Sequence, residues 1–183
     1  MANLGLIFQL AHIVAFHLMM MQAKSSFKFT NIKCLDHDVK FSSFEICKLS
    51  VVGRGLVSLN IKVGLYKTPV TNSTINVAIY KKANGFKPFL YNYTVNVCAF
   101  FANRKRYPVI KVLFDIFLQH SNLNHTCPYY DAIVVKDLVL NENMFRLLPL
   151  PEGEYMFKLK VFAYNDLKAT TEVILFRKDS LMP

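Results

Sequence analysis

Apolar and polar residues alternate through most of this chain of 183 residues. Successive side chains of a strand point to opposite faces, so a period of two predicts strands with one buried face. The clearest segments are 59–65 and 155–161; in the second, Tyr155, Phe157, Leu159 and Val161 oppose Lys158 and Lys160. The same pattern recurs at 27–34, 44–52, 75–80, 89–97, 133–140 and 171–176. We therefore expect about eight strands.

Turn-forming residues separate these segments. They occur as Gly53-Arg54-Gly55, Thr68-Pro69, Asn84-Gly85, Pro149 to Gly153 and Asn165-Asp166. Glycine, proline, asparagine and aspartate favour the backbone conformations that tight turns require. Many short strands with turns between them indicate an all-β fold, an antiparallel β-sandwich.

Segment 108–120 departs from this pattern, because its apolar residues follow helical spacing after a proline suited to a first helical turn. Lys111, Asp115 and Gln119 form a single polar line, so most of the helix surface must be covered. The helix either packs under a loop as ordinary core, which we slightly favour, or lines the entrance of an apolar cavity. One short apolar α-helix is therefore expected beside the strands.

Residues 1–23 contain no charged side chain except for histidine, and most of 4–21 is apolar. This pattern predicts a secretory signal peptide cleaved after Ala23, Ser25 or Ser26. An uncleaved anchor helix is the alternative, although the apolar run is close to the minimum length that spans a bilayer. We expect residues 24–183 to form one secreted, extracellular domain.

Four cysteines, Cys34, Cys47, Cys98 and Cys127, form an even set without a CxxC pair. In a secreted domain such a set indicates two disulfides, for which three pairings exist. We favour Cys34 with Cys47 and Cys98 with Cys127, which keeps each bridge between neighbouring segments, and the other two pairings stay open. No second ligand accompanies the histidines at metal-site spacing, so no metal site is expected.

Three sequons for N-linked glycosylation begin at Asn72, Asn92 and Asn124. The last lies in the hexapeptide Asn-His-Thr-Cys-Pro-Tyr of residues 124–129, beside Cys127. Sequons are glycosylated in the secretory pathway, where disulfides also persist. The two halves of this motif therefore indicate the same compartment, and all three asparagines are candidate glycosylation sites.

The formal net charge of +10 is unevenly placed. Segment 24–111 holds 15 Lys and Arg against 3 Asp and Glu, whereas 112–183 holds 7 against 9. A basic face would attract an acidic receptor surface or an anionic membrane; dispersed lysines on solvated strands are the alternative. Arg104, Lys105 and Arg106 form the candidate basic patch, with a solvated turn as the alternative. No nucleic-acid-binding motif is visible, so nucleic acid is not an expected partner.

The sequence contains no GxSxG, HExxH or glycine-rich phosphate loop. Asp36-His37-Asp38 combines acids with an imidazole, but adjacent side chains point in different directions. A solvated loop is therefore favoured over an acid/base site. We expect a protein that is not an enzyme and that needs no cofactor.

The chain holds 16 Phe and 9 Tyr but no Trp. On the inner faces of two sheets, these rings either fill an ordinary core or, where the sheets splay apart, line an apolar cavity for a lipid. The sequence is compatible with both arrangements.

Several motifs together resemble a known family. They are Phe29 to Cys34, Cys47, Cys98-Ala99-Phe100, Asn124 to Tyr129, and Leu148-Pro149 followed by Gly153-Glu154-Tyr155. In this order they resemble a large insect family of small secreted domains of unknown function. That family looks like a distant branch of the ML lipid-recognition superfamily, and it is similar to insect chemosensory proteins implicated in pheromone perception.

The resemblance implies an immunoglobulin-like β-sandwich cup with an apolar interior, and it supports the favoured disulfide pairing. Our leading hypothesis is a secreted, non-enzymatic binding protein for a lipid or other hydrophobic small molecule, with a chemosensory or immune role. The candidate ligand-binding residues, chosen by strand face, are Val95, Phe114, Phe117, Phe157, Leu159 and Val161. The alternatives are a protein-interaction module or receptor cofactor with a solid core and a basic face and, least favoured, a secreted hydrolase.

Overall fold

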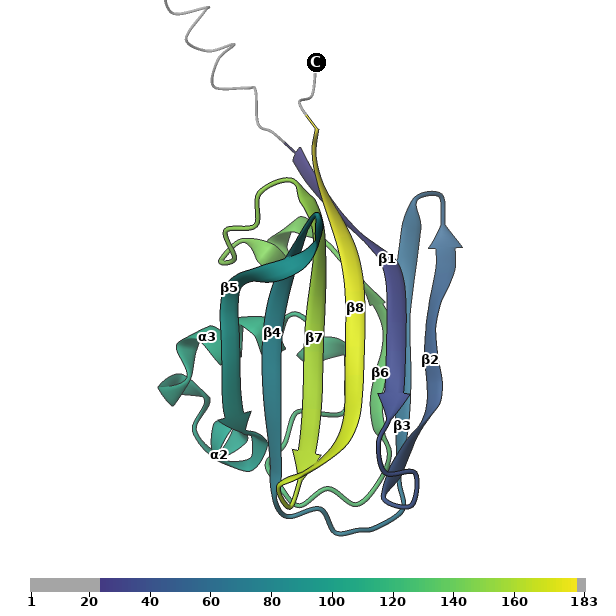
Figure 1. Cartoon of the computed structure of the whole chain (residues 1–183), viewed down its shortest axis with the longest axis vertical. Helices are drawn as coiled ribbons and strands as arrows, with labels where there is room; N and C mark the ends of the chain where they lie inside the picture. The colour runs from purple at the N-terminus through teal and green to yellow at the C-terminus, as the bar shows by residue number, and fades with distance from the viewer. Residues whose placement is uncertain (1–23, 181–183) are drawn as a thin grey trace, which may run out of the picture.

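A computed structural model describes residues 24–180, so the expected signal peptide lies outside the described residues. Two antiparallel sheets form the domain (Figure 1). The larger sheet has the order β1 (Lys24–Asp36), β8 (Asp166–Ser180), β7 (Gly153–Ala163), β4 (Ser73–Ala83) and β5 (Gly85–Asn96). The smaller has the order β2 (Ser42–Gly53), β3 (Leu56–Leu65) and β6 (Ile133–Val139). The eight alternating segments coincide with these strands, and the expected all-β sandwich is confirmed.

Tight turns join β2 to β3, β4 to β5 and β7 to β8 as hairpins. Gly55, with φ of 76°, lies in the turn from β2 to β3, where a residue with a β-carbon would be strained. Tyr164 and Asn165, with φ of 52° and 66°, form the turn from β7 to β8, in which Ala163 pairs with Asp166. Two-residue turns with positive φ follow the twist of the flanking strands, so they set the register of this hairpin.

A helical segment connects β5 to β6. It contains α2 (Val97–Ala102), the 3₁₀ turn η1 (Arg104–Arg106), α3 (Pro108–Asp115) and the 3₁₀ turn η2 (Leu118–His120). The expected apolar helix is present as α3, although it ends at Asp115. The sequence did not suggest α2, which begins directly at the end of β5 because the Asn96 side chain caps it by accepting a hydrogen bond from Ala99 N at 2.9 Å.

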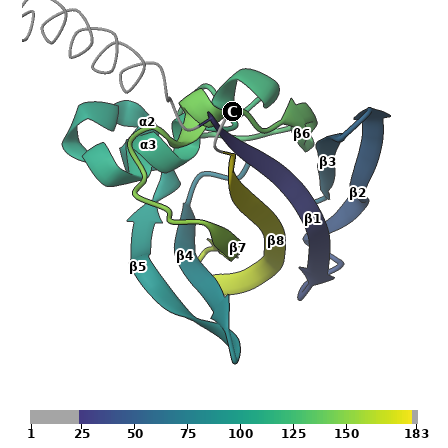
Figure 2. The same ribbon diagram turned by 90° about the horizontal axis from the view of Figure 1, so that it is seen from above.

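The helices lie on the side of the molecule where β5 and β6 form the edges of their sheets (Figure 2). On the opposite side, β1 of the larger sheet runs beside β2 of the smaller sheet. A third 3₁₀ turn, η3 (Glu142–Phe145), follows β6. Among the described residues, the helices are all too short to cross a bilayer.

Two disulfides tie these parts together. Cys34 in β1 is bonded to Cys47 in β2, which links the two sheets. Cys98 in α2 is bonded to Cys127 in the loop before β6, which encloses the helical segment in a covalent loop. This is the pairing that the sequence favoured.

Candidate ligand cavity

A cavity of about 280 Å³ lies between the two sheets. Its wall comes largely from inward-pointing residues of the strands other than β5. On the larger sheet, Val77 pairs with Leu159 and Ile75 with Val161, and all four side chains line the cavity. The register of the β4–β7 pair therefore gathers their inward residues into one apolar surface.

The helical segment supplies a further wall. Leu113 and Phe114 of α3 and Ile116 directly after it are buried and line the cavity, together with the half-buried Phe117. The apolar side chains of this segment belong to the core cluster, as favoured from the sequence, and several of them also line the cavity. Because α3 fills the side on which β5 and β6 remain unpaired with each other, it closes the sandwich there.

Aromatic residues line the cavity near η3 and near the loop between β1 and β2. Near η3, Phe27 and Phe145 are stacked with ring centroids 4.0 Å apart, and Phe145 reaches the cavity wall. Phe41 in the loop between β1 and β2 lines the cavity, and Lys168 of β8 lies over its ring at 4.7 Å. A cation at this distance from an aromatic face is attracted by the ring quadrupole.

Five of the six candidate ligand-binding residues line this cavity. They are Phe114, Phe117, Phe157, Leu159 and Val161. Val95 is buried, with 5% of its surface exposed, but it packs in the core outside the cavity wall. Val95 belongs to β5, the edge strand that contacts α2, and pairs with Ile75 of β4, so it lies to one side of the cavity.

Sequence reasoning did not select several wall residues. Phe29 of β1 and the row Leu59, Ile61 and Val63 of β3 line the cavity. The alternation had already placed the β3 residues on one apolar face. The alternation alone does not show how the two sheets pack, so it could not show which apolar faces meet across the cavity.

The candidate basic patch is divided between two roles. Arg104 is half-buried, forms an ion pair with Asp115 of α3 and lies over the Phe100 ring at 5.8 Å. Lys105 and Arg106 are exposed. Arg104 therefore holds η1 against the helices, whereas Lys105 and Arg106 are the more exposed cations of the patch.

The three sequon asparagines are all exposed. Asn92 lies on the outer face of β5, where the Asn76 side chain donates hydrogen bonds to Asn92 Oδ1 at 2.7 Å and to Thr94 Oγ1 at 3.0 Å. Asn72 accepts a hydrogen bond from Asn96 Nδ2 at 3.2 Å. Glycans at these positions would project away from the cavity.

The hexapeptide 124–129 anchors the end of the helical segment. Besides the Cys127 disulfide, the Thr126 hydroxyl donates to Cys98 O at 3.1 Å. Tyr129 exchanges backbone hydrogen bonds with Val70, and its hydroxyl donates to His125 O at 2.7 Å. The Tyr129 ring also lines the cavity, and its burial raises the pKa of the phenol to about 12. One motif thus connects the covalent loop with the cavity wall.

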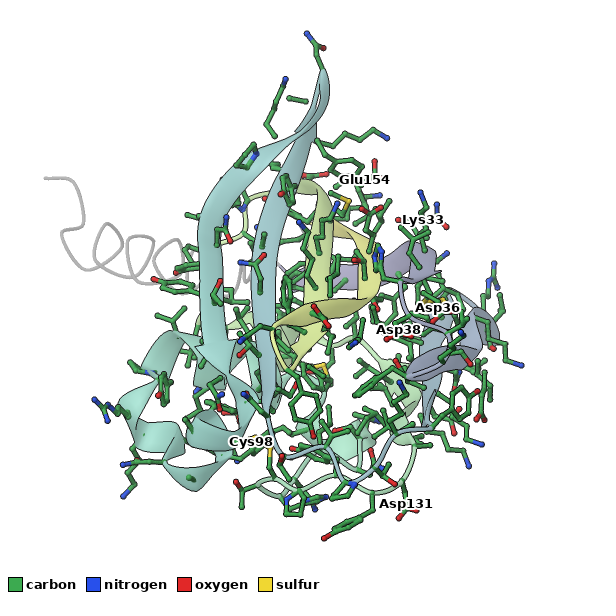
Figure 3. All side chains as sticks on the ribbon, turned by 60° about the horizontal axis from the view of Figure 1, so that its bottom comes forward. Lys33, Asp36, Asp38, Cys98, Asp131 and Glu154 are labelled. Carbon is green, nitrogen blue, oxygen red and sulfur yellow. A yellow bond between two sulfur atoms is a disulfide. The ribbon has the colours of Figure 1, made fainter. Side chains whose placement is uncertain are left out.

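The acidic and imidazole cluster holds the loop between β1 and β2 in place. Asp36 Oδ1 accepts a hydrogen bond from Phe44 N at 3.1 Å, and His37 Nε2 lies 2.9 Å from Thr170 Oγ1. Asp38 Oδ2 accepts a hydrogen bond from Lys168 Nζ at 2.8 Å. Figure 3 shows Asp36 and Asp38 together on this side of the molecule, well apart from Cys98. Within residues 24–180 there is no cluster of three or more His, Cys, Asp or Glu that could hold a metal ion.

Comparison with known proteins gives one family match. None of the curated proteins matches the sequence. The family model described as "Protein of unknown function (DUF1091)" matches residues 75–157, which run from β4 through the helical segment and β6 into β7 and include most of the helical cavity wall.

Proposed function

We propose that this protein is a secreted, non-enzymatic binding protein that holds a lipid or another hydrophobic small molecule between its two sheets. The observation that carries the proposal is the cavity of about 280 Å³, whose wall is almost entirely apolar. Apolar cavities of about 150 Å³ already stay dry and take up small apolar molecules. Filling this one would replace empty space with dispersion contacts on every side.

The proposed compartment follows from covalent features. Two disulfides persist in an oxidising environment, and the three sequon asparagines are exposed to the glycosylation machinery of the same pathway. The resemblance to the ML superfamily supports the same proposal and adds a chemosensory or immune context. Secretion would bring the cavity into contact with extracellular lipids.

The helical wall is the proposed entrance. The two sheets that face the cavity are held by hydrogen-bonded ladders, whereas α3 closes its side through side-chain packing. Displacing a short helix breaks apolar contacts but no ladder hydrogen bonds. A ligand would therefore enter between β5 and β6 more readily than through either sheet.

Two observations favour lipid binding over a protein-interaction module with a solid core and a basic face. The interior contains a cavity, and Arg104 of the candidate basic patch is engaged with Asp115. A receptor or anionic membrane that meets the exposed Lys105 and Arg106 would be a partner of the lipid carrier in this proposal.

The test has two parts: recovery of a ligand bound to the wild-type protein, and loss of ligand binding when a bulky side chain fills the cavity. Protein secreted from insect cells is extracted and its lipids are identified by mass spectrometry, and displacement of an apolar fluorescent probe is measured in parallel. Val161→Trp places a large ring in the cavity and is expected to abolish probe binding. Lys160→Trp, on the outer face of the same strand, is the matched control and is expected to bind normally. Folded wild-type protein that carries no lipid and binds no probe would refute the proposal, as would normal probe binding by Val161→Trp.

A further inference from the structure

The charges at the cavity wall bear on which ligand it accepts. Among the described residues that line the cavity, only Lys158 and Lys168 are charged at neutral pH. Transfer of an ionised group from water into an apolar cavity is costly unless an opposite charge is free to pair with it. The state of these two ammonium groups therefore decides whether an anionic lipid can be held.

Lys158 directs its charge away from the cavity. Its Nζ lies 2.7 Å from Oε1 of Glu172, the residue directly opposite on β8. The next pair along the ladder, Leu159 with Thr171, faces the cavity. Because successive residues alternate between faces, the ion pair of Lys158 and Glu172 lies on the outer face of the sheet.

Lys168 also lines the cavity, and the charge of its ammonium group is already compensated by an ion pair. Only 8% of its surface is exposed. Its Nζ lies 2.8 Å from Asp38 Oδ2 and 3.7 Å from Asp166 Oδ2, over the Phe41 ring. The hydrogen bond with Lys168 holds the pKa of Asp38 below its usual value, and the same bond raises the pKa of Lys168. Both groups are therefore ionised at neutral pH and compensate each other.

An ionised ligand would find no favourable partner there. A carboxylate brought to Lys168 would meet one ammonium group that two protein carboxylates already surround. Lys67 also acts on Asp38, but its own side chain is exposed to solvent. The remaining polar groups on the wall include the hydroxyls of Ser42 and Thr171, which can hydrogen-bond an alcohol or an ester without a charge.

We infer that the cavity selects an electrically neutral ligand, such as a long-chain alcohol, ester or hydrocarbon, over an ionised fatty acid, and that Asp38 determines this specificity by keeping Lys168 paired. This inference rests on the proposed function, because it names the class of ligand for the same cavity.

The test compares three ligands that share one chain length: a fatty acid, the corresponding alcohol and the methyl ester. Their affinities are measured by displacement of an uncharged apolar probe at neutral pH. The wild-type protein is expected to bind the alcohol and the ester at least about tenfold more tightly than the acid. Asp38→Asn removes the nearer carboxylate from Lys168 and leaves only the more distant, exposed Asp166, so it is expected to raise the affinity for the acid by about tenfold, with little change for the alcohol.

Glu172→Gln is the matched control. It removes one negative charge, as Asp38→Asn does, but frees Lys158 on the outer face, so the affinity for the acid should stay at the wild-type value. A measurement that needs no variant is the affinity of wild-type protein for the acid at acidic pH, which should rise as the ligand carboxylate becomes protonated.

Equal wild-type affinities for acid and alcohol at neutral pH would overturn the inference while leaving lipid binding intact. An equal gain in acid affinity in Glu172→Gln and Asp38→Asn would overturn the role of Asp38. If folded protein bound neither the probe nor any of the three ligands, the proposed function itself would fail.

Discussion

The ring of Phe114 in α3 lies 4.7 Å from the ring of Phe100 in α2, centroid to centroid. Phe101 and Phe117 also contact Phe114, at 5.6 and 4.9 Å. Phe100 is completely buried, and Phe114 presents another side to the cavity. The two helices thus share one aromatic cluster, and the cavity wall on this side depends on α2 as well as on α3.

Replacing Phe114 by alanine should therefore lower both stability and ligand affinity. The loss of a buried phenylalanine costs roughly 3–5 kcal/mol of unfolding free energy. Val109→Ala, at a half-buried position of the same helix outside the wall, should cost less than about 1.5 kcal/mol. Chemical denaturation gives both values. A cost for Phe114→Ala no larger than that for Val109→Ala would contradict the role of the cluster.

Removing the disulfide around the helical segment should loosen this wall selectively. The bridge between Cys98 and Cys127 spans 29 residues, for which the chain-entropy model gives about 3–4 kcal/mol. We expect the double variant Cys98→Ser/Cys127→Ser to lose about that much unfolding free energy. Trypsin should then cut first after the exposed Lys105 or Arg106. The variant Cys34→Ser/Cys47→Ser is the comparison, and early cleavage at 105–106 in that variant as well would show that the segment is not held by its own bridge.

Sequence patterns were sufficient for the strands because burial of one face imposes a period of two on the residues themselves. Leu59, Ile61 and Val63 therefore marked a strand before any partner was known. The same patterns could not show α2, because Val97 continues the alternation of β5 and the helix depends on the local cap at Asn96. Nor could they place Val95 outside the cavity wall. Alternation along a strand shows which face of the sheet a side chain occupies, but it does not show whether that strand lies at the centre or at the edge of the sheet. The hydrogen bond between Asp38 and Lys168 joins residues 130 positions apart, a relation that only the folded chain displays.

Tyr129 should make stability fall at high pH. Burial raises its pKa from 10.0 to about 12, so the folded state resists ionisation more than the unfolded state does. The resulting stabilisation is complete below pH 10 and is lost as the pH rises through about 12. Unfolding free energy measured across this window should decline less steeply in Tyr129→Phe than in wild-type protein. The exposed Tyr130→Phe should behave as wild type, and identical slopes for all three proteins would refute the assignment.

At neutral pH, Tyr129→Phe should lose about 1 kcal/mol of unfolding free energy, because it lacks the hydrogen bond to His125 O.

A tryptophan introduced into the cavity should report ligand binding directly, because the natural chain contains none. Phe157→Trp replaces one aromatic wall residue by another, and its fluorescence should shift when an apolar ligand fills the cavity. Tyr130→Trp, at a position 60% exposed, is the control and should not respond. An equal response of both variants would indicate nonspecific binding to the surface.

The three sequons should carry glycans in secreted protein. Asn72, Asn92 and Asn124 are replaced by glutamine one at a time. Each substitution should reduce the mass of the secreted protein by one glycan. Electrophoresis with and without an N-glycosidase measures this change. Asn84→Gln, at an exposed asparagine outside any sequon, is the control and should leave the mass pattern unchanged. A sequon variant with unaltered mobility would show that its site is unoccupied.

No ladder of hydrogen bonds joins the two sheets within residues 24–180. They are connected by one disulfide where β1 runs beside β2, and by the helical segment where β5 and β6 face each other. Separating the sheets on the helical side would therefore cost apolar contacts but would leave every ladder intact. An occupant larger than the empty volume would therefore be expected to displace the helical segment before it broke any strand pairing.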